Sequence, residues 1–327
     1  MAASQAHRHG RSSHRCSSRL GVTMTTTRLD WVRKHSLLTY VLLAFAFSWG
    51  VEIPLALRAQ GLIKAPIPFS THYLAAYGPM LSAILVTCIT EGSSGLRELL
   101  GRMLKWRINP AWALVAFAPL GLYALTVLVL WLLQGQWPDL RLMGQIEFLP
   151  NLGPSALLFW TLTFGIGEET GWRGYALPRL QSGRSALSAT IILWAIWALW
   201  HLPMFFHLYD VAIVAGFLLG LLAGAITFTW LYNSTGGSIL MVALWHGAFN
   251  FTTACTACKA GMATAVLSTL VMVWAVLTVI LFKPSTLSNS EKQVVESGSN
   301  QTAHALIGRH ALRAHQPTGY HGRNERR

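Results

Sequence analysis

The sequence contains few charged residues: Asp, Glu, Lys and Arg make up 11% of its 327 residues, whereas 53% are hydrophobic. Soluble domains are about a quarter charged, so this composition argues against an ordinary soluble protein. Negatively charged residues are the scarcer kind, with 12 Asp and Glu against 25 Lys and Arg. A carboxylate inside an apolar segment of such a chain therefore requires a specific explanation.

Cysteine is also scarce, and the four cysteines (Cys16, Cys88, Cys255 and Cys258) do not have the pattern of a disulfide framework. Cys255 and Cys258 form a C-x-x-C, but a structural zinc site needs two further ligands and no second pair is present. We therefore interpret the cysteines as packed or unpaired thiols.

Apolar runs long enough to cross a bilayer, which takes roughly 20 residues, recur along the chain. We identify eight, at Leu37–Leu57, Tyr73–Thr90, Ala111–Leu133, Pro154–Glu168, Leu187–His207, Val211–Tyr232, Ser238–Thr256 and Met262–Phe282. They predict an all-α fold, a polytopic membrane bundle of about eight transmembrane helices. The fourth run is short and ends in charge.

The basic residues predict the topology of this bundle. Only four of the 25 fall in the segments predicted to lie outside: Arg58, Lys64, Arg141 and Lys259. An excess of Lys and Arg on the inner side is typical of multi-pass proteins, so we expect a cell-membrane protein with cytoplasmic termini in contact with the lipid bilayer. The net charge of +13 then reflects topology, and no nucleic-acid partner is predicted.

Three regions follow from this pattern. Residues 1–36 are Ser-, His- and Arg-rich and are predicted to be a disordered cytoplasmic N-terminus, within which Met24 is a second candidate start. Residues 37–283 form the bundle, and its first span is too long for a signal peptide and is expected to be retained. Residues 284–327 are predicted to be a polar cytoplasmic tail.

Few ionisable residues lie at membrane depth, where they are costly and usually face a polar interior. Among the acids these are Glu52, Glu168 and Glu169, and among the histidines His201 and His246. Glu52 lies close to the predicted outer end of the first span, so we interpret it as an interfacial, snorkelling side chain.

A stripe of small residues, Gly216, Gly220 and Gly224, is spaced for close helix packing and needs no chemistry.

The stretch EETGWR combines two carboxylates with an arginine. If the helix continues, Glu169 and Arg173 are four residues apart and can pair on one face. Glu168 then points about 100° away and is free to face a cavity, as a general base requires. The alternative is a charge network at the cytoplasmic end of a span.

The histidines have similar alternatives. His201 lies in an apolar, tryptophan-rich run before Pro203, and such a residue is either a packed core histidine or a catalytic one. His246 and Asn250 are four residues apart on one helix face, so they can bind a metal, donate to an oxyanion, or clasp a neighbouring helix.

One convergent polar site explains these residues more economically than three separate structural roles. There is no H-E-x-x-H zinc-protease motif, no G-x-S-x-G and no aspartyl-protease pair.

Three motifs resemble those of the CAAX protease and bacteriocin-processing (CPBP) family of intramembrane proteases, over residues 150–255. EETGWRG, from Glu168 to Gly174, is similar to the family's E-E-x-x-x-R-G; WALWH, from Trp197 to His201, is similar to its F-x-x-x-H; and HGAFN, from His246 to Asn250, is similar to its H-x-x-x-N/D. Trp197 stands where the family usually has Phe. This keeps an aromatic wall but alters the width of the cavity.

The resemblance implies an endopeptidase whose site lies in the membrane and opens towards the cytoplasm. It implies catalytic roles for Glu168 as the base that activates water, for His201 in holding that water, and for His246 and Asn250 in stabilising the oxyanion. Glu169 and Arg173 would shape the site. Members have been described as metalloproteases, so either no cofactor is required or a divalent metal such as zinc is bound; we favour the metal-free alternative.

The expected substrate is a membrane-anchored or lipidated, CAAX-like peptide or protein. A non-catalytic bacteriocin-immunity or membrane scaffolding protein of the same fold is the main alternative. A proton-coupled transporter is a further one, but we find no inverted repeats.

Overall fold

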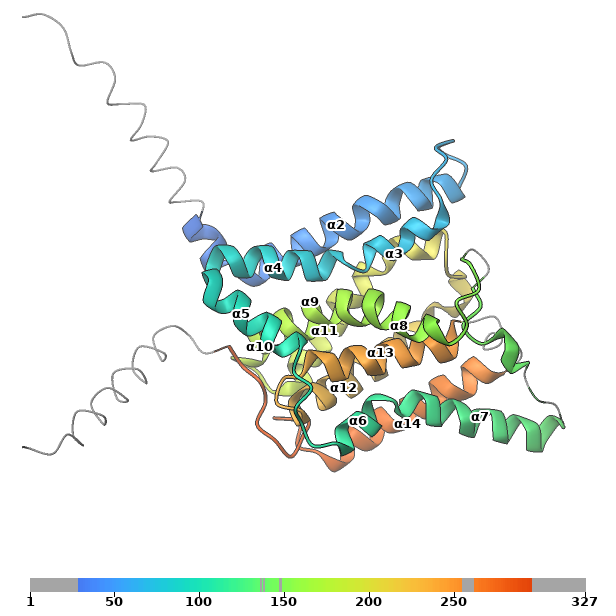
Figure 1. The fold of residues 1–327 in the computed structure, drawn as a ribbon. Coiled ribbons are helices and arrows are strands. Elements are labelled where there is room, and N and C mark those ends of the chain that lie inside the picture. The colour runs from blue at the N-terminus through green and yellow to red at the C-terminus, as the bar shows by residue number, and fades with distance from the viewer. Residues whose placement is uncertain (1–28, 136, 138, 147–148, 255–261, 296–327) are drawn as a thin grey trace, which may run out of the picture.

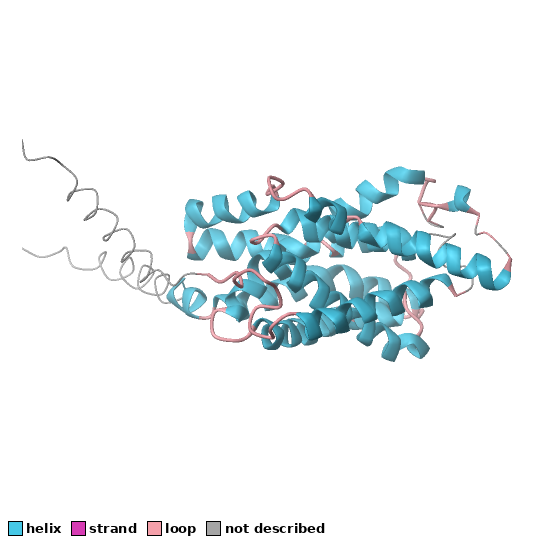
Figure 2. Cartoon of the chain, turned by 90° about the horizontal axis from the view of Figure 1, so that it is seen from below, coloured by secondary structure: helices cyan, strands magenta, loops and turns pink. Residues whose placement is uncertain are grey.

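The computed structural model describes residues 29–135, 137, 139–146, 149–254 and 262–295. Within these residues all regular structure is helical and there is no strand (Figure 2). Five helical segments are long and apolar enough to span a membrane: Ser36–Ala59, Phe69–Thr90, Ala186–Phe206, Val214–Ser234 and Ala263–Leu281. Ala118–Gln134 and Ile239–Thr253 are shorter apolar helices. The predicted helical membrane bundle is confirmed.

Figure 1 shows the arrangement of the elements. The α-helices are α2 (Ser36–Ala59), α3 (His72–Ala75), α4 (Gly78–Thr90), α5 (Gly92–Met103), α6 (Ala111–Ala116), α7 (Ala118–Gln134), α8 (Ala156–Trp160), α9 (Glu169–Gly171), α10 (Leu177–Gln181), α11 (Ala186–Trp200), α12 (Val214–Ser234), α13 (Ile239–Thr253) and α14 (Ala263–Leu281). Short 3₁₀ turns are η1 (Phe69–Thr71), η2 (Leu140–Leu142), η3 (Gly153–Ser155), η6 (Leu202–Phe206) and η7 (Val211–Ile213). Two segments, η4 (Thr161–Glu168) and η5 (Trp172–Ala176), are π-helical.

The fourth predicted span differs most from the structure. We expected it to end at Glu168, but α8, η4, α9, η5 and α10 run on consecutively to Gln181. The charged residues do not end the span because they are buried inside the bundle, with Glu169 and Arg173 fully covered. Trp172, Tyr175 and Leu177 continue the buried face beyond them.

This continuous segment runs through the middle of the bundle. In Figure 1, α8, α9 and α13 lie between α2 and α4 along one side and α7 and α14 along the other. The contacts agree, because α13 packs against α8 and η4, and α9 packs against α4. Residues 167–178 are therefore enclosed by helices and can hold polar groups away from lipid.

Glycines allow η4 and α13 to approach closely. A Cβ atom on Gly165 would lie 2.4 Å from the Ala243 carbonyl oxygen, and one on Gly247 would lie 2.3 Å from Thr161 Oγ1. This contact places the η4 backbone directly against the helix that carries His246.

The stripe predicted to pack closely does not do so. A Cβ on Gly216 or Gly224 would have nothing within 4 Å, and one on Gly220 would meet only Met272 Cε at 3.8 Å. The small-residue spacing is present, but α12 does not present it to a close neighbour, so that interpretation was wrong.

Gly247→Ala is expected to destabilise the bundle by about 1–3 kcal/mol, since the new methyl group overlaps Thr161 in a packed interior. The measurement is SDS-induced unfolding of purified protein in mixed micelles. Gly224→Ala is the matched control, with an expected change of no more than about 1 kcal/mol in the stabilising direction, because alanine favours a helix and meets no neighbour. Equal effects of the two substitutions would contradict the close approach of η4 and α13.

The first part of the predicted tail contacts the bundle. Gln181 Nε2 donates to the Gln293 carbonyl oxygen at 2.7 Å, Asn233 Nδ2 donates to Thr286 O at 2.8 Å, and Leu287 is fully buried. Residues 1–28 and 296–327 lie outside the described residues, so the predictions for both ends of the chain stay predictions.

Candidate active site

The two adjacent glutamates lie where a π-helical segment passes into a short α turn. Glu168 ends η4, Glu169 begins α9, and Arg173 lies in η5. π turns are rare and occur frequently at functional sites. All three side chains are buried, with Glu168 3% exposed and the other two fully covered.

The predicted pairing of Glu169 with Arg173 is observed. Arg173 Nη1 donates to Glu169 Oε1 at 3.1 Å and lies 3.0 Å from Oε2, where the angle is too poor for a hydrogen bond. The guanidinium carbon also lies 4.6 Å from the ring centre of Trp197 and 4.7 Å from that of Phe228. Two aromatic faces and a carboxylate thus compensate a cation that is costly to bury.

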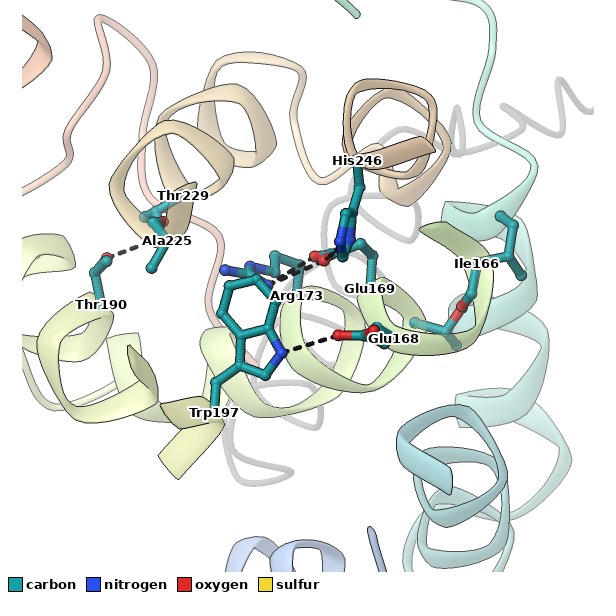
Figure 3. Close-up of polar contacts among 10 residues, drawn as sticks. Ile166, Glu168, Glu169, Arg173, Thr190, Trp197, Ala225, Thr229 and His246 are labelled. Carbon is teal, nitrogen blue, oxygen red and sulfur yellow. Dashed lines mark hydrogen bonds and ion pairs between the residues drawn. The ribbon is translucent and has the colours of Figure 1, made fainter. Parts of the chain in front are cut away.

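Glu169 has a second partner on another helix. His246 Nδ1, on α13, lies 2.9 Å from Glu169 Oε1 (Figure 3). An ionised carboxylate only accepts hydrogen bonds, so Nδ1 carries the hydrogen and Nε2 is the nitrogen left for other contacts. The sequence predicted Arg173 as the partner of Glu169, and the structure adds His246 as a second partner from another helix.

Glu168 is held instead by Trp197. The indole Nε1 donates to Glu168 Oε2 at 2.9 Å, and Figure 3 shows the two side chains meeting from different helices. Among the described residues, Oε1 has no hydrogen-bond partner. Trp197 therefore does more than replace one aromatic wall by another, because a phenylalanine could not make this bond.

The rings of His201 and His246 both lie close to the ring of Trp197. The ring centre of Trp197 is 5.6 Å from that of His201 and 5.9 Å from that of His246. α11 ends at Trp200, and η6, which contains Pro203, follows His201. A proline cannot continue the helical hydrogen bonds, so the chain turns where His201 meets the cluster.

His201 is oriented by its own helix. Its Nδ1 lies 2.7 Å from the Trp197 carbonyl oxygen and donates to it, which leaves Nε2 as the outward nitrogen. No hydrogen bond or ion pair joins His201 to Glu168 within the described residues. The structure brings His201 to the cluster through Trp197, without direct contact with the carboxylate.

Asn250 follows His246 by one turn of α13 and is half-buried. Its side chain has no hydrogen bond to any described residue, so the predicted neighbour of His246 shares its helix without joining the bonded cluster. The cluster as observed contains Glu168, Glu169, Arg173, Trp197, His201 and His246.

The described residues contain no ready-made metal site. Within them no three His, Cys, Asp or Glu side chains are arranged so as to hold one ion. The Glu169 carboxylate is engaged by Arg173 and by His246 Nδ1, so a zinc ligand set would have to come from Glu168, His201 and His246. Cys255 and Cys258 lie outside the described residues.

Residues 150–252 match the Rce1-like family, described as type II CAAX prenyl endopeptidase Rce1-like. The chain is also similar to CAAX prenyl protease 2 of Methanococcus maripaludis, with 29% identity over 125 residues. That alignment covers 36% of this chain and 45% of the relative, so the chain spans less than half of the relative's length. The matched region contains every residue of the cluster, and the predicted resemblance to the CAAX protease family is confirmed for residues 150–252 of this multi-pass membrane protein.

Proposed function

We propose that this protein is an intramembrane endopeptidase that hydrolyses a peptide bond in a lipidated, CAAX-like peptide or membrane-anchored protein. One observation carries the proposal. Glu168 is a buried carboxylate with one oxygen held by Trp197 and the other unbonded among the described residues, in a cluster with two histidines from other helices. The Rce1-like match over the same residues supports the choice of reaction.

The proposed reaction uses Glu168 as the general base. Its free Oε1 takes a proton from a water molecule, and the water oxygen forms a bond to the scissile carbonyl carbon. The carbonyl oxygen then carries the negative charge of a tetrahedral intermediate. Collapse breaks the carbon–nitrogen bond, and the proton held by Glu168 passes to the leaving amine.

The remaining residues stabilise charge and fix geometry. His246 Nε2, when protonated, and the Asn250 amide are proposed to donate to the oxyanion. Glu169 orients the His246 ring and offsets part of the imidazolium charge, while Arg173 holds the Glu169 carboxylate in place. The outward nitrogen of His201 is proposed to hold the attacking water. No step in this scheme passes through a metal.

A lipidated substrate suits the location of the cluster. A helical bundle in the membrane gives a prenylated chain direct access from the bilayer, without extraction into water. The concentration of Lys and Arg in predicted inner segments favours a cell-membrane location with cytoplasmic termini, and entry of substrate from the cytoplasmic side.

The test is reconstitution of purified protein in liposomes with quenched fluorescent peptides ending in a farnesylated C-a-a-X sequence. We expect cleavage after the lipidated cysteine, located by mass spectrometry, with one ¹⁸O atom from labelled water in the new carboxylate. The same peptide without the lipid is the control and should be cut much more slowly. Intact peptides after prolonged incubation would overturn the proposal, and loss of activity in chelator that zinc restores would overturn the metal-free scheme.

Trp197→Phe is expected to lower kcat by about tenfold with little change in KM. A hydrogen bond to a charged group contributes about 1.5–3 kcal/mol, and the phenyl ring keeps the aromatic wall without holding Glu168 Oε2. Trp194→Phe is the matched control, because Trp194 Nε1, on the same helix, donates to the Leu218 carbonyl oxygen away from the cluster. A rise in KM at unchanged kcat would contradict this role for the indole.

A further inference from the structure

A second buried polar cluster lies outside the residues used so far. Glu52 on α2 is fully buried, so its interpretation as a snorkelling side chain was wrong. His72 Nδ1, at the start of α3, lies 2.8 Å from Glu52 Oε1, and His207 Nε2, just after η6, lies 2.7 Å from Oε2. Each carboxylate oxygen thus accepts from one imidazole, and three segments far apart in the sequence meet at one side chain.

Glu52 is the central one of three attachments between α2 and the segment 200–207. Trp49 Nε1 donates to the Trp200 carbonyl oxygen at 3.0 Å, and Gln60 Nε2 donates to the Phe206 carbonyl oxygen at 2.7 Å. Trp49 and Glu52 on α2, together with Gln60 at its C-terminal cap, reach both ends of one short segment. α2 therefore forms a brace along the chain that carries His201.

The backbone hydrogen bonds of this segment are short-range turns, without the regular ladder of an α-helix. η6 is a single 3₁₀ stretch, a weaker geometry than the α-helix, and its backbone bonds include Met204 N to His201 O at 2.9 Å. External attachments must therefore define where the segment lies relative to the rest of the bundle. Glu52 holds it at His207, six residues after His201.

The same cluster also contacts the segment that carries Glu168. The His72 ring centre lies 5.9 Å from that of Phe164, on η4 and four residues before Glu168. Glu52 is thus bonded to the histidine that follows η6 and to the histidine that packs on η4. It is the shared anchor of the two segments whose relative position sets the distance between His201 and Glu168.

We propose that Glu52, with His72 and His207, is a positioning cluster that fixes η6 and η4 relative to each other and so places His201 at the reaction centre. The catalytic part of this role rests on the proposed protease function. The attachment of α2 to residues 200–207 does not depend on that function. The carboxylate is required because it accepts from both imidazoles at once. A glutamine offers one acceptor oxygen and one NH2 donor, so it can pair with both imidazoles only if one of them changes tautomer and gives up the N–H that faces residue 52.

The test is Glu52→Gln, examined by hydrogen exchange and by steady-state kinetics on one preparation. Backbone amides of residues 201–208 are expected to exchange about tenfold faster, because local opening is easier when an anchor is lost, while those of residues 239–253 stay unchanged. kcat is expected to fall about 10- to 100-fold with KM nearly constant, since small misplacements of reacting groups cost that much. Glu91→Gln, which alters a contact with Arg179 elsewhere, should change neither measurement.

Gln60→Ala is a milder second variant that removes only the bond to Phe206 and should change exchange in residues 201–208 in the same direction by a smaller factor. Unchanged exchange in both variants would overturn the brace. Faster exchange with unaltered kcat would overturn its part in the reaction, and a lower kcat with unaltered exchange would overturn positioning as the cause. If the wild type cleaves no peptide, the protease function fails, and the exchange measurement still decides whether Glu52 anchors the segment.

Discussion

Glu168→Gln is expected to lower kcat for peptide cleavage by about 10³-fold or more while the protein stays folded in detergent. A positioned general base contributes about 10²–10⁴-fold, and an amide cannot take a proton from water. Glutamine keeps the shape of the side chain and can still accept from Trp197 Nε1. The loss should therefore appear in kcat, with substrate binding preserved.

Two measurements accompany this prediction. SDS-induced unfolding should give nearly the same midpoint for Glu168→Gln and wild type, which separates loss of chemistry from loss of fold. Glu98→Gln, at an exposed carboxylate beside Arg102, should retain full activity. Full cleavage by purified Glu168→Gln would assign the base elsewhere. A cellular phenotype that survives this substitution would favour the non-catalytic immunity or scaffolding alternative.

Arg173→Met is expected to destabilise the bundle by about 3–5 kcal/mol, because removing one partner of a buried ion pair leaves the other charge uncompensated. The affected charge is Glu169, fully covered and shared with His246. Methionine keeps most of the volume between Trp197 and Phe228, so a cavity is not the main cause. SDS-induced unfolding with activity measured in parallel checks the value.

A double substitution separates charge from packing. Glu169→Gln combined with Arg173→Met removes both charges and keeps an acceptor for His246 Nδ1, so it should recover much of the lost stability. Arg141→Met is the control, because Arg141 and Asp139 form an exposed pair; solvent screening makes its removal nearly neutral. A double variant as unstable as Arg173→Met alone would show that the guanidinium acts through its ring contacts instead.

Much of the fold follows from local sequence properties. Apolar runs of membrane length predicted the helices, because spans must satisfy their own backbone hydrogen bonds. The fourth span was cut short at Glu168, because burial of charge depends on which helices surround it. Side-chain partners at four-residue spacing were also predictable, and the pair of Glu169 and Arg173 is the example.

The rest of the candidate site depends on tertiary contacts. That His246 bonds to Glu169, and Trp197 to Glu168, follows from how α11 and α13 meet η4 and α9, which no local spacing encodes. Glu52 was misassigned because its partners His72 and His207 lie 20 and 155 residues away. In the sequence, this cluster is indicated only by an acid inside a span, Glu52, and by two histidines near the ends of spans, His72 and His207, to which no role had been assigned.

The π-helical turns around the glutamates have a consequence for how the length of this segment can vary. A π turn closes its hydrogen bonds one residue later than an α turn. η4 and η5 therefore contain more residues per turn than a regular α-helix does. Removing a single residue between Trp160 and Glu168 would let an α turn form there with both carboxylates on nearly the same face, because the wider turn accommodates one extra residue. The same deletion in a regular helix such as α11 would turn every later residue by about 100° around the axis. The segment that carries the glutamates can therefore lose a residue at η4 with less change in the direction of Glu168 and Glu169 than a deletion in a regular helix would cause.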